Sequence, residues 1–297
     1  MERQTPSKKE FWAYFSQDDD FFMGLSDIAF RTCFHAKIHH NLEIQVNHAL
    51  NTGKAFYPKR LALMHHWMEL WDKKGLSHDL PEYRFAEQMF KMAYAFEDEG
   101  VRTDLSQFAT QRLTAEEQQR YDKVLYSLRD VYTFTDVPVD DSDLDTIVDA
   151  ALWAANGGNL QPLRFMIIHE AACPGLFPES TAKNAPVHLV ICYDTEGRHA
   201  LSAMSGRTNV PEDSMLNHRN SPLDVGSALT NIRLAAAACG LSFSRQTMTP
   251  ALSARLLKQF DLSERVHPMA YVELGYSDEI GLALPKTAVR DSVLAVI

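Results

Sequence analysis

A glycine-rich stretch near the middle of the chain carries two side-chain amides, Asn159 and Gln161, shortly after Gly157 and Gly158. Glycines allow backbone N–H groups to approach a ligand closely, and each amide offers both a donor and an acceptor. Together these groups suit the binding of a flat polar heterocycle. A surface connection whose amides only satisfy turn backbone would have the same composition, so the residues alone leave both interpretations open.

A helix and a strand are predicted to hold this stretch on its two sides. Apolar residues recur at spacings of three and four over 144–155, which is the buried stripe of a helix, and Asp140 or the aspartate after it is the predicted N-cap. The Asn-Gly-Gly sequence at 156–158 ends that helix, because glycine adopts the backbone angles of a helix exit. Pro162 prevents the helix from resuming, and 165–169 is predicted to be a strand.

The run Gly-Asn-Leu-Gln-Pro-Leu-Arg-Phe, which ends at Phe165, resembles the flavin-binding loop of the nitroreductase family, whose usual form is Ser-x-Gly-Asn-x-Gln-Pro-Trp-x-Phe. In that family the loop contacts the isoalloxazine ring and the ribityl chain of FMN. The resemblance implies that Asn159, Gln161, Pro162 and Leu163 contact FMN here. Leu163 stands where the family commonly has tryptophan, and this difference would reshape the wall of the pocket.

The phosphate-binding motif of the same family, Arg-Arg-Ser-x-Arg-x-Phe, is largely lost. When the motif is aligned on Phe134, its first arginine, its serine and its last arginine are replaced by Leu128, Asp130 and Tyr132. Only Arg129 is retained, and the resemblance makes it the phosphate contact of this segment. A phosphate site needs hydrogen-bond donors and positive charge, so Asp130 would repel the phosphate.

Two later segments also resemble parts of the family that surround the flavin. The predicted strand that contains Arg245, Gln246 and Thr247 corresponds to the family strand beneath the ring. The resemblance places these residues near the flavin, with backbone N–H groups that meet its N5 atom. Lys286 and Arg290 stand roughly where the family has a C-terminal basic pair that also holds the phosphate.

A long helix is predicted to start with Ser221 as its N-cap and to end before Gly240. Its sequence from Asp224 to Asn231 resembles the family helix Asp-x-Gly-x-Ala-x-x-Asn-Leu, which commonly lies near the dimer axis. The resemblance therefore implies a homodimer with flavin at the interface. The preceding stretch, 195–220, has few apolar residues and is predicted to be a mobile loop or short helix that could cover a pocket.

The first part of the chain lacks alternating strand patterns and is rich in helix formers. We predict a helical N-terminal extension over residues 1–122 and a nitroreductase-like flavin-binding domain over residues 123–297. The helices predicted in the first part of the chain cover 21–34, 42–50, 61–71, 82–97 and 114–128. Gly53 is the predicted stop after the second of these helices, and Gly100 is the predicted stop after the fourth.

Histidines are frequent in this extension. His35 and His39 could share a helix face with Glu43, and adjacent pairs stand at His39–His40 and at 65–66. Adjacent helix residues point about 100° apart, so each pair offers one ligand per face, and we predict core or interface histidines rather than a metal site. The sequence His40-Asn-Leu-Glu43 is also similar to a His-x-x-Glu-bearing helical extension found in nitroreductase relatives that are associated with surface-polysaccharide biosynthesis.

Acidic residues outnumber basic ones, 39 against 29, which gives a formal net charge of −10. This balance argues against a nucleic-acid partner, which would require a positive surface. No apolar run approaches the roughly 18 residues that span a bilayer, and the first residues lack the layout of a signal peptide. The four cysteines are widely spaced and form no Cys-x-x-Cys pair, which is typical of a reducing compartment. We therefore expect a cytoplasmic protein without a membrane span.

The expected fold is α+β, with a mostly antiparallel central sheet flanked by helices and preceded by the helical region. By resemblance, the expected function is that of an FMN-dependent oxidoreductase, which passes electrons from NAD(P)H through the flavin to an unidentified small-molecule acceptor. The lost phosphate motif supports an alternative, a non-catalytic or partner-dependent protein of the same fold. No side chain is predicted as a catalytic acid or base.

Overall fold

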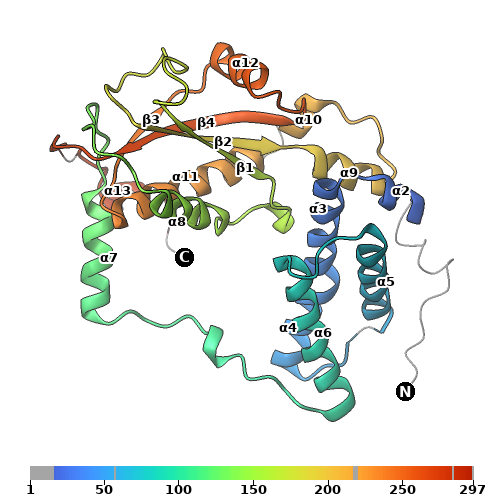
Figure 1. The fold of residues 1–297 in the computed structure, drawn as a ribbon. Coiled ribbons are helices and arrows are strands. Elements are labelled where there is room, and N and C mark those ends of the chain that lie inside the picture. Colours follow the sequence, from blue (N-terminus) through green and yellow to red (C-terminus); the bar gives the residue numbers. More distant parts are fainter. Residues whose placement is uncertain (1–16, 57, 217–219, 283, 296–297) are drawn as a thin grey trace.

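The computed structural model describes residues 17–56, 58–216, 220–282 and 284–295. An N-terminal group of helices lies beside a four-stranded sheet, and a long connection links the two parts (Figure 1). This connection contains the short 3₁₀ helix η2 (Ser106–Phe108) and ends in α7 (Ala115–Ser127). Thr114 and Glu117 form the capping box that begins α7. The predicted domain boundary after residue 122 falls within this helix.

The N-terminal helices bury an aromatic core. Trp67 and Trp71 pack against Phe30 and Phe34, with ring centroids 4.7 Å apart for the pair Phe34–Trp71. The core is completed by Ala200 and Met204, which belong to a later helix, so the two parts of the chain share buried surface. The helices of this group are α2 (Asp19–Gly24), α3 (Asp27–Lys37), the π-helix η1 (Ile38–Glu43), α4 (Ile44–Thr52), α5 (Pro58–Lys74) and α6 (Pro81–Glu99).

Two of the predicted helix boundaries in this group are wrong. The helix predicted over 21–34 is broken before α3, because Ser26 caps α3 with its side chain, which accepts a hydrogen bond from the Ala29 N–H. The helix predicted over 42–50 is part of a continuous run in which α3 passes through η1 into α4. The predicted stops at Gly53 and Gly100 are confirmed, since both glycines end their helices with left-handed backbone angles.

The central sheet is antiparallel throughout its named strands and has the order β1-β2-β4-β3. The predicted mostly antiparallel sheet flanked by helices is therefore confirmed. Two isolated parallel bridges, Asp130 with Phe243 and Thr133 with Lys183, attach the segment after α7 to the outer side of β3 and to a neighbouring loop. The strands are β1 (Leu163–His169), β2 (Val187–Asp194), β3 (Ser242–Gln246) and β4 (Val266–Gly275).

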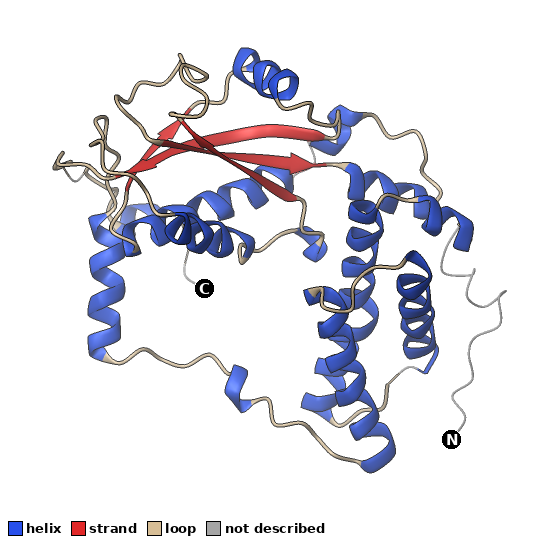
Figure 2. Ribbon diagram, in the orientation of Figure 1, coloured by secondary structure: helices blue, strands red, loops and turns tan. Residues whose placement is uncertain are grey.

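Helices cover both faces of the sheet (Figure 2). One core lies between the sheet and the pair α8 (Asp141–Leu152) and α11 (Asn220–Ala238), and a second core lies on the opposite face beneath α12 (Pro250–Gln259). Because both of its faces are covered, every residue of β2 is buried. The chain then ends in the short helix α13 (Val289–Ser292).

The segment predicted as a mobile loop or short helix contains two helices, α9 (Glu196–Met204) and α10 (Glu212–Leu216). α9 packs on α3, which explains why a stretch with few apolar residues is nevertheless ordered. The predicted N-cap Ser221 is also wrong, since this residue lies inside α11 and donates its hydroxyl hydrogen to the Met215 carbonyl. No helix within the described residues is long and apolar enough to cross a lipid bilayer.

Candidate functional site

The amide loop, residues 156–161, has an unusual backbone. α8 ends at Leu152, slightly before the predicted exit, and the chain then forms the short 3₁₀ helix η3 (Gly157–Asn159). Gly158, Asn159 and Gln161 all have positive φ angles of 69°, 52° and 51°. Such angles are unfavourable for residues with a side chain, and they concentrate at ligand sites when the surrounding structure holds them.

Hydrogen bonds within and beneath the loop hold this conformation. The Asn156 side chain accepts from the Gln161 N–H at 3.1 Å, and the Gln161 amide donates to Asn159 Oδ1 at 2.6 Å. The Gly157 N–H donates to Asp224 Oδ1 on α11 at 3.1 Å. A Cβ atom at Gly157 would collide with the Asn220 amide, so only glycine allows the loop to lie this close to α11. Gly226, also on this helix, has open space where a Cβ atom would stand.

A cavity of about 440 Å³ lies against the amide loop. Its wall includes Asn159 and Gln161 from the loop and Trp153, the residue after α8. Trp153 is 81% exposed. The N-terminal group of helices contributes His39, which is hydrogen bonded through Nδ1 to Glu43 Oε2 at 2.9 Å. An exposed indole and several amides around one hollow are suited to a planar polar ligand.

Pro162 and Leu163, also predicted as flavin contacts, are buried. Leu163 packs in the core beneath α8 and α11 rather than facing the cavity. The substitution of leucine for the family's tryptophan thus adds to the core, and the exposed aromatic ring at this end of the molecule is Trp153.

Of the three predicted flavin contacts at the end of β3, Gln246 is the one whose side chain is held by hydrogen bonds within the protein. Arg245 and Thr247 are exposed, whereas the Gln246 amide donates to Ser244 Oγ at 3.0 Å and to the buried Glu273 carboxylate at 2.8 Å. Gln246 Oε1 also accepts from the Thr181 hydroxyl at 3.1 Å. β3 is an edge strand, so its end is accessible to a ligand.

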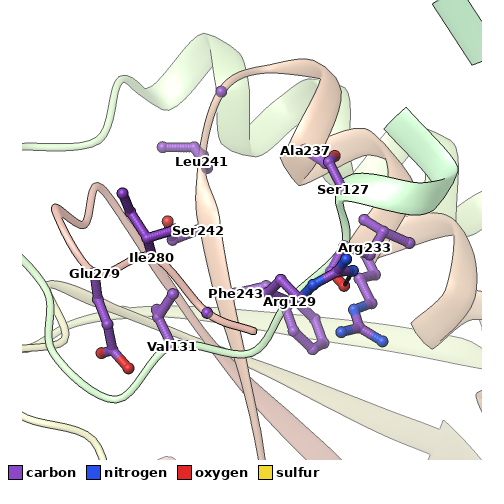
Figure 3. A pocket seen from close by; sticks show the side chains of 13 residues that line it. Ser127, Arg129, Val131, Arg233, Ala237, Leu241, Ser242, Phe243, Glu279 and Ile280 are labelled. Atoms are coloured by element: carbon purple, nitrogen blue, oxygen red, sulfur yellow. Dashed lines mark hydrogen bonds between the residues drawn. The ribbon is translucent and has the colours of Figure 1, made fainter. Parts of the chain in front are cut away.

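A second cavity, of about 390 Å³, lies where α7 ends and β3 begins (Figure 3). Arg129 lines it together with Arg233 of α11, and the two guanidinium groups lie on the same side of the cavity (Figure 3). Arg233 Nη2 is 2.8 Å from the Asp130 carboxylate, while its buried Nε–H has no hydrogen-bond partner. Arg129 Nη1 donates to the Leu128 carbonyl at 2.6 Å.

Glu279 lies on the opposite side of this second cavity (Figure 3). Its carboxylate accepts hydrogen bonds from the Tyr132 and Thr133 N–H groups, at 2.8 and 3.0 Å. Lys286 and Arg290, predicted to be near the phosphate, lie in the exposed C-terminal segment. Arg290 is 3.5 Å from the neighbouring Asp291 carboxylate.

One chain does not bring the two cavities together. β1 begins beside Tyr193, which pairs with His267 near the start of β4, whereas β3 begins beside Gly275 at the end of β4. At roughly 3.3 Å per residue these ends are about 25 Å apart along β4. The amide loop and Arg129 therefore lie at opposite ends of the sheet, and a single ligand contacting both would need a second copy of the chain.

The sequence profile described as the nitroreductase family matches residues 125–276. The chain belongs to the nitroreductase family. Among its relatives, an Archaeoglobus fulgidus protein with the provisional name NADH dehydrogenase/NAD(P)H nitroreductase is 24% identical over 165 residues, which cover 52% of this chain and 83% of that protein.

Solved structures resemble this chain over a similar stretch. NfrA2 of B. megaterium has a TM-score of 0.49 and 20% identity, covering 56% of this chain and 70% of that one. A provisionally named nitroreductase from Desulfovibrio desulfuricans, solved in complex with FMN, has a TM-score of 0.48 and 22% identity, covering 60% of this chain and 96% of that one.

Three residues of the two cavities carry weak signals in the sequence. Trp153 stands shortly before the glycine-rich stretch. His39 belongs to a histidine pair that was predicted to lie in a core or an interface rather than to bind a metal, and it lies in the wall of the first cavity. Arg233 lies within the apolar stripe pattern of α11, and no local signal connects it to Arg129.

Four histidines of the N-terminal region, at 35, 39, 66 and 78, are paired with acidic side chains, whereas His65 is hydrogen bonded to the Tyr94 hydroxyl. His66 Nε2 is 2.8 Å from Asp19, and His35 Nε2 is 3.9 Å from the buried Glu82. Burial is the main cause that lowers the pKa of His35. Within the described residues, no group of three or more His, Cys, Asp and Glu side chains is arranged to hold a metal ion.

The carboxylate of Glu212 gathers a cluster of hydrogen-bonded side chains at the end of the sheet where the amide loop lies. Glu212 on α10 accepts hydrogen bonds from Thr195, Arg265, His199 and His267, the last two at 2.7 and 2.8 Å. Burial alone would raise the pKa of Glu212, but these hydrogen bonds lower it to about 2. These hydrogen bonds connect α10 to the residue that follows β2, to His199 in α9 and to the start of β4.

Proposed function

We propose that this protein is a flavin-dependent NAD(P)H oxidoreductase that works as a homodimer, with FMN between the two copies, and reduces a small molecule. Membership of the nitroreductase family supports the proposal, and the amide loop is the observation that carries it. In such enzymes the flavin supplies the redox chemistry, and the protein positions the ring and sets the charge around it. The relative named as an NAD(P)H nitroreductase supports a nicotinamide as the electron source.

The residues at the ring end fit a flavin. Gly158, Asn159 and Gln161, which have positive φ angles, line the cavity, and Trp153 adds an apolar surface. Asn159 and Gln161 would orient the ring through hydrogen bonds to its polar edge. His39 would limit the access of water on the side of the N-terminal helices.

The residues at the other end fit a phosphate in charge and in donor chemistry. Arg129 and Arg233 supply two guanidinium groups, and the unpartnered buried Nε–H of Arg233 is a donor that a phosphate oxygen would satisfy. The backbone of Arg245, Gln246 and Thr247 at the β3 edge would lie along the ring. Lys286 and Arg290 remain predicted contacts, supported by the resemblance.

The separation of the two cavities supports the homodimer. If each flavin used the amide loop of one copy and the β3 edge with Arg129 of the other, both ends of the sheet would contribute to each site. A monomer would leave the loop and the phosphate-binding residues about 25 Å apart.

A specific observation favours a second candidate function. Asp130 and Glu279 place two carboxylates around the second cavity, so a protein of this fold that has lost its flavin and acts non-catalytically is the alternative. The absorption spectrum of the purified protein, before and after addition of FMN and gel filtration, distinguishes the two.

The enzyme proposal predicts flavin absorbance at about one FMN per chain, which NADH or NADPH should bleach without oxygen. A folded protein that retains no flavin at micromolar FMN would contradict it and support the alternative.

Three further predictions remain proposals. These are the division into a helical extension over 1–122 and a flavin domain over 123–297, the association of the extension with surface-polysaccharide biosynthesis, and a cytoplasmic location. The location is supported by four widely spaced free cysteines.

A further inference from the structure

The second cavity retains only one residue of the family's phosphate motif, and α11 supplies another. We propose that Arg233 replaces the lost arginines and, together with Arg129, selects a flavin that carries a terminal phosphate. This inference rests on the proposed flavin function and adds a binding residue that no family motif assigns.

The first support is the position of the two arginines. Arg129 follows α7, whereas Arg233 lies on α11, and both guanidinium groups line the same side of the cavity (Figure 3). Two like charges held together in a partly enclosed space repel one another. A doubly charged phosphate between them would remove that repulsion and accept several hydrogen bonds.

The second support is an unfilled donor. Arg233 Nε–H is buried and has no partner, and a buried unpaired donor on a charged group is unfavourable. The same side chain is held in place from two directions, by Asp130 at 2.8 Å and by the Phe243 ring, whose centroid is 5.5 Å from the guanidinium carbon. The guanidinium group is thus oriented before a ligand arrives.

The third support concerns the two carboxylates. Glu279 lies on the far side of the cavity and is already satisfied by the Tyr132 and Thr133 N–H groups. Asp130 uses one carboxylate oxygen to hold Arg233 Nη2, which leaves Nε for a ligand. We therefore assign Asp130 as a positioning residue for Arg233 and also as the group that moderates its charge.

The hydroxyl-bearing side chains of Ser127 and Ser242 also line this cavity. Space near Arg129 is limited, since a Cβ atom at Gly281 would lie 2.9 Å from the Arg129 Cβ atom. The Ser127 hydroxyl already donates to the Val124 carbonyl at 3.0 Å, so Ser242 is the serine that adds a donor. A cavity of about 390 Å³ with two guanidinium groups and the Ser242 hydroxyl, in which the Glu279 carboxylate is bonded to backbone N–H groups, fits a phosphate on a short polyol chain, as in FMN.

The test compares the binding of FMN with that of riboflavin, which lacks the phosphate. The full-length protein and its Arg233→Gln variant are titrated with each flavin, and quenching of flavin fluorescence gives the dissociation constants. We expect the wild-type protein to prefer FMN, and the variant to lose FMN affinity by about tenfold to hundredfold while riboflavin affinity changes far less.

Arg255→Gln is the matched control. Arg255 also pairs with a carboxylate, that of Glu179 at 2.9 Å, and its side chain is 35% exposed against 33% for Arg233. It lies on α12, on the other face of the sheet, so its loss should leave the ratio of the two affinities unchanged. Arg233→Lys, which keeps the charge but not the planar fork, should lose part of the FMN preference.

The wild-type protein alone provides a second measurement. In the ³¹P spectrum of bound FMN, two nearby guanidinium groups should move the titration of the phosphate below that of free FMN, which titrates near pH 6. An unshifted titration, or an Arg233→Gln variant that weakens both flavins equally or neither, would overturn the assignment and leave the proposed function intact. If the folded wild-type protein binds neither flavin, the proposed function fails and this inference fails with it.

Discussion

The two cavities differ in how much of the family's local sequence they retain. At the amide loop the family's local sequence is retained, and the loop is held by hydrogen bonds to Asp224 and by contact with α11. At the second cavity the local motif is lost, and the charge comes from Arg129 with Arg233, which are far apart in the sequence. A site that depends on backbone shape must keep its local sequence, whereas a site that depends on charge can draw it from another element.

The largest effect that tests this comparison concerns Asp224. This buried carboxylate accepts from the Gly157 N–H and from the Tyr193 hydroxyl, and Arg198 lies 3.8 Å away. We expect Asp224→Ala to lower the free energy of unfolding by about 3 kcal/mol, because it removes a buried carboxylate that accepts from the loop N–H and balances the charge of the Arg198 guanidinium. Urea unfolding measures the loss.

The same variant should lower the affinities for FMN and for riboflavin by similar factors, since the amide loop would contact the isoalloxazine ring that both flavins share. A selective loss of FMN would contradict the assignment of this end of the sheet to the ring.

The next effect is the loss of stability in acid that we expect from the Glu212 cluster, which lies at the same end of the sheet as the amide loop. Because the pKa of Glu212 is about 2 in the folded protein and 4.5 without its partners, its contribution to stability is complete above pH 4.5 and is lost as the pH falls toward 2. Partial solvent exposure limits this contribution to about 1–2 kcal/mol.

The measurement is the free energy of unfolding of wild type and Glu212→Gln as a function of pH. The difference between the two proteins should be largest above pH 4.5 and should shrink as the pH is lowered. A difference that stays constant from pH 6 to pH 3 would show that the cluster does not stabilise α10 through charge.

A smaller effect is expected at the second cavity, where Asp130 pairs with Arg233. Asp130→Ser restores the serine of the family motif and releases Arg233 from its ion pair. We expect FMN affinity to rise severalfold, equivalent to about 1 kcal/mol, with little change for riboflavin. Since the pair is partly exposed, stability should change by less than about 1 kcal/mol. Reduced FMN affinity in a folded variant would mean that positioning of Arg233 matters more than its charge.

The smallest effect is expected at Asn159. Glycine adopts its φ angle of 52° without strain, but Asn159→Gly also removes the acceptor of the Gln161 amide. These effects oppose one another, so the free energy of unfolding should change by less than about 0.5 kcal/mol. The variant also removes an amide from the cavity wall, and both flavins should bind more weakly. Thermal unfolding should therefore change little while flavin titration shows weaker binding, and unchanged affinity for both flavins would remove Asn159 from the site.

Local pattern was sufficient to predict much of the core. The strand predicted over 165–169 and the glycine stops at Gly53 and Gly100 depend on neighbours within a few residues, and the structure agrees with them closely. The antiparallel sheet and the family were likewise predicted through the motif that ends at Phe165.

Long-range geometry set the limit of prediction. Arg233 reaches Arg129 only because α11 packs beside the segment after α7, and an apolar stripe does not reveal where a single cation on its flank points. The order in α9 and α10 depends on the Glu212 cluster, whose partners come from separate elements. Ser221 was misassigned because the helix begins earlier than its best capping residue.

The π-helix η1 has a consequence for which side chains of the following helix face inward. A π-helical turn accommodates one more residue than an α-helical turn, so it rotates the following residues by about 100° relative to an uninterrupted helix. η1 carries His39 and Glu43 and joins α3, which packs on α9, to α4. The extra residue in this turn therefore sets the register in which Val46, Ala49 and Leu50 of α4 enter the aromatic core.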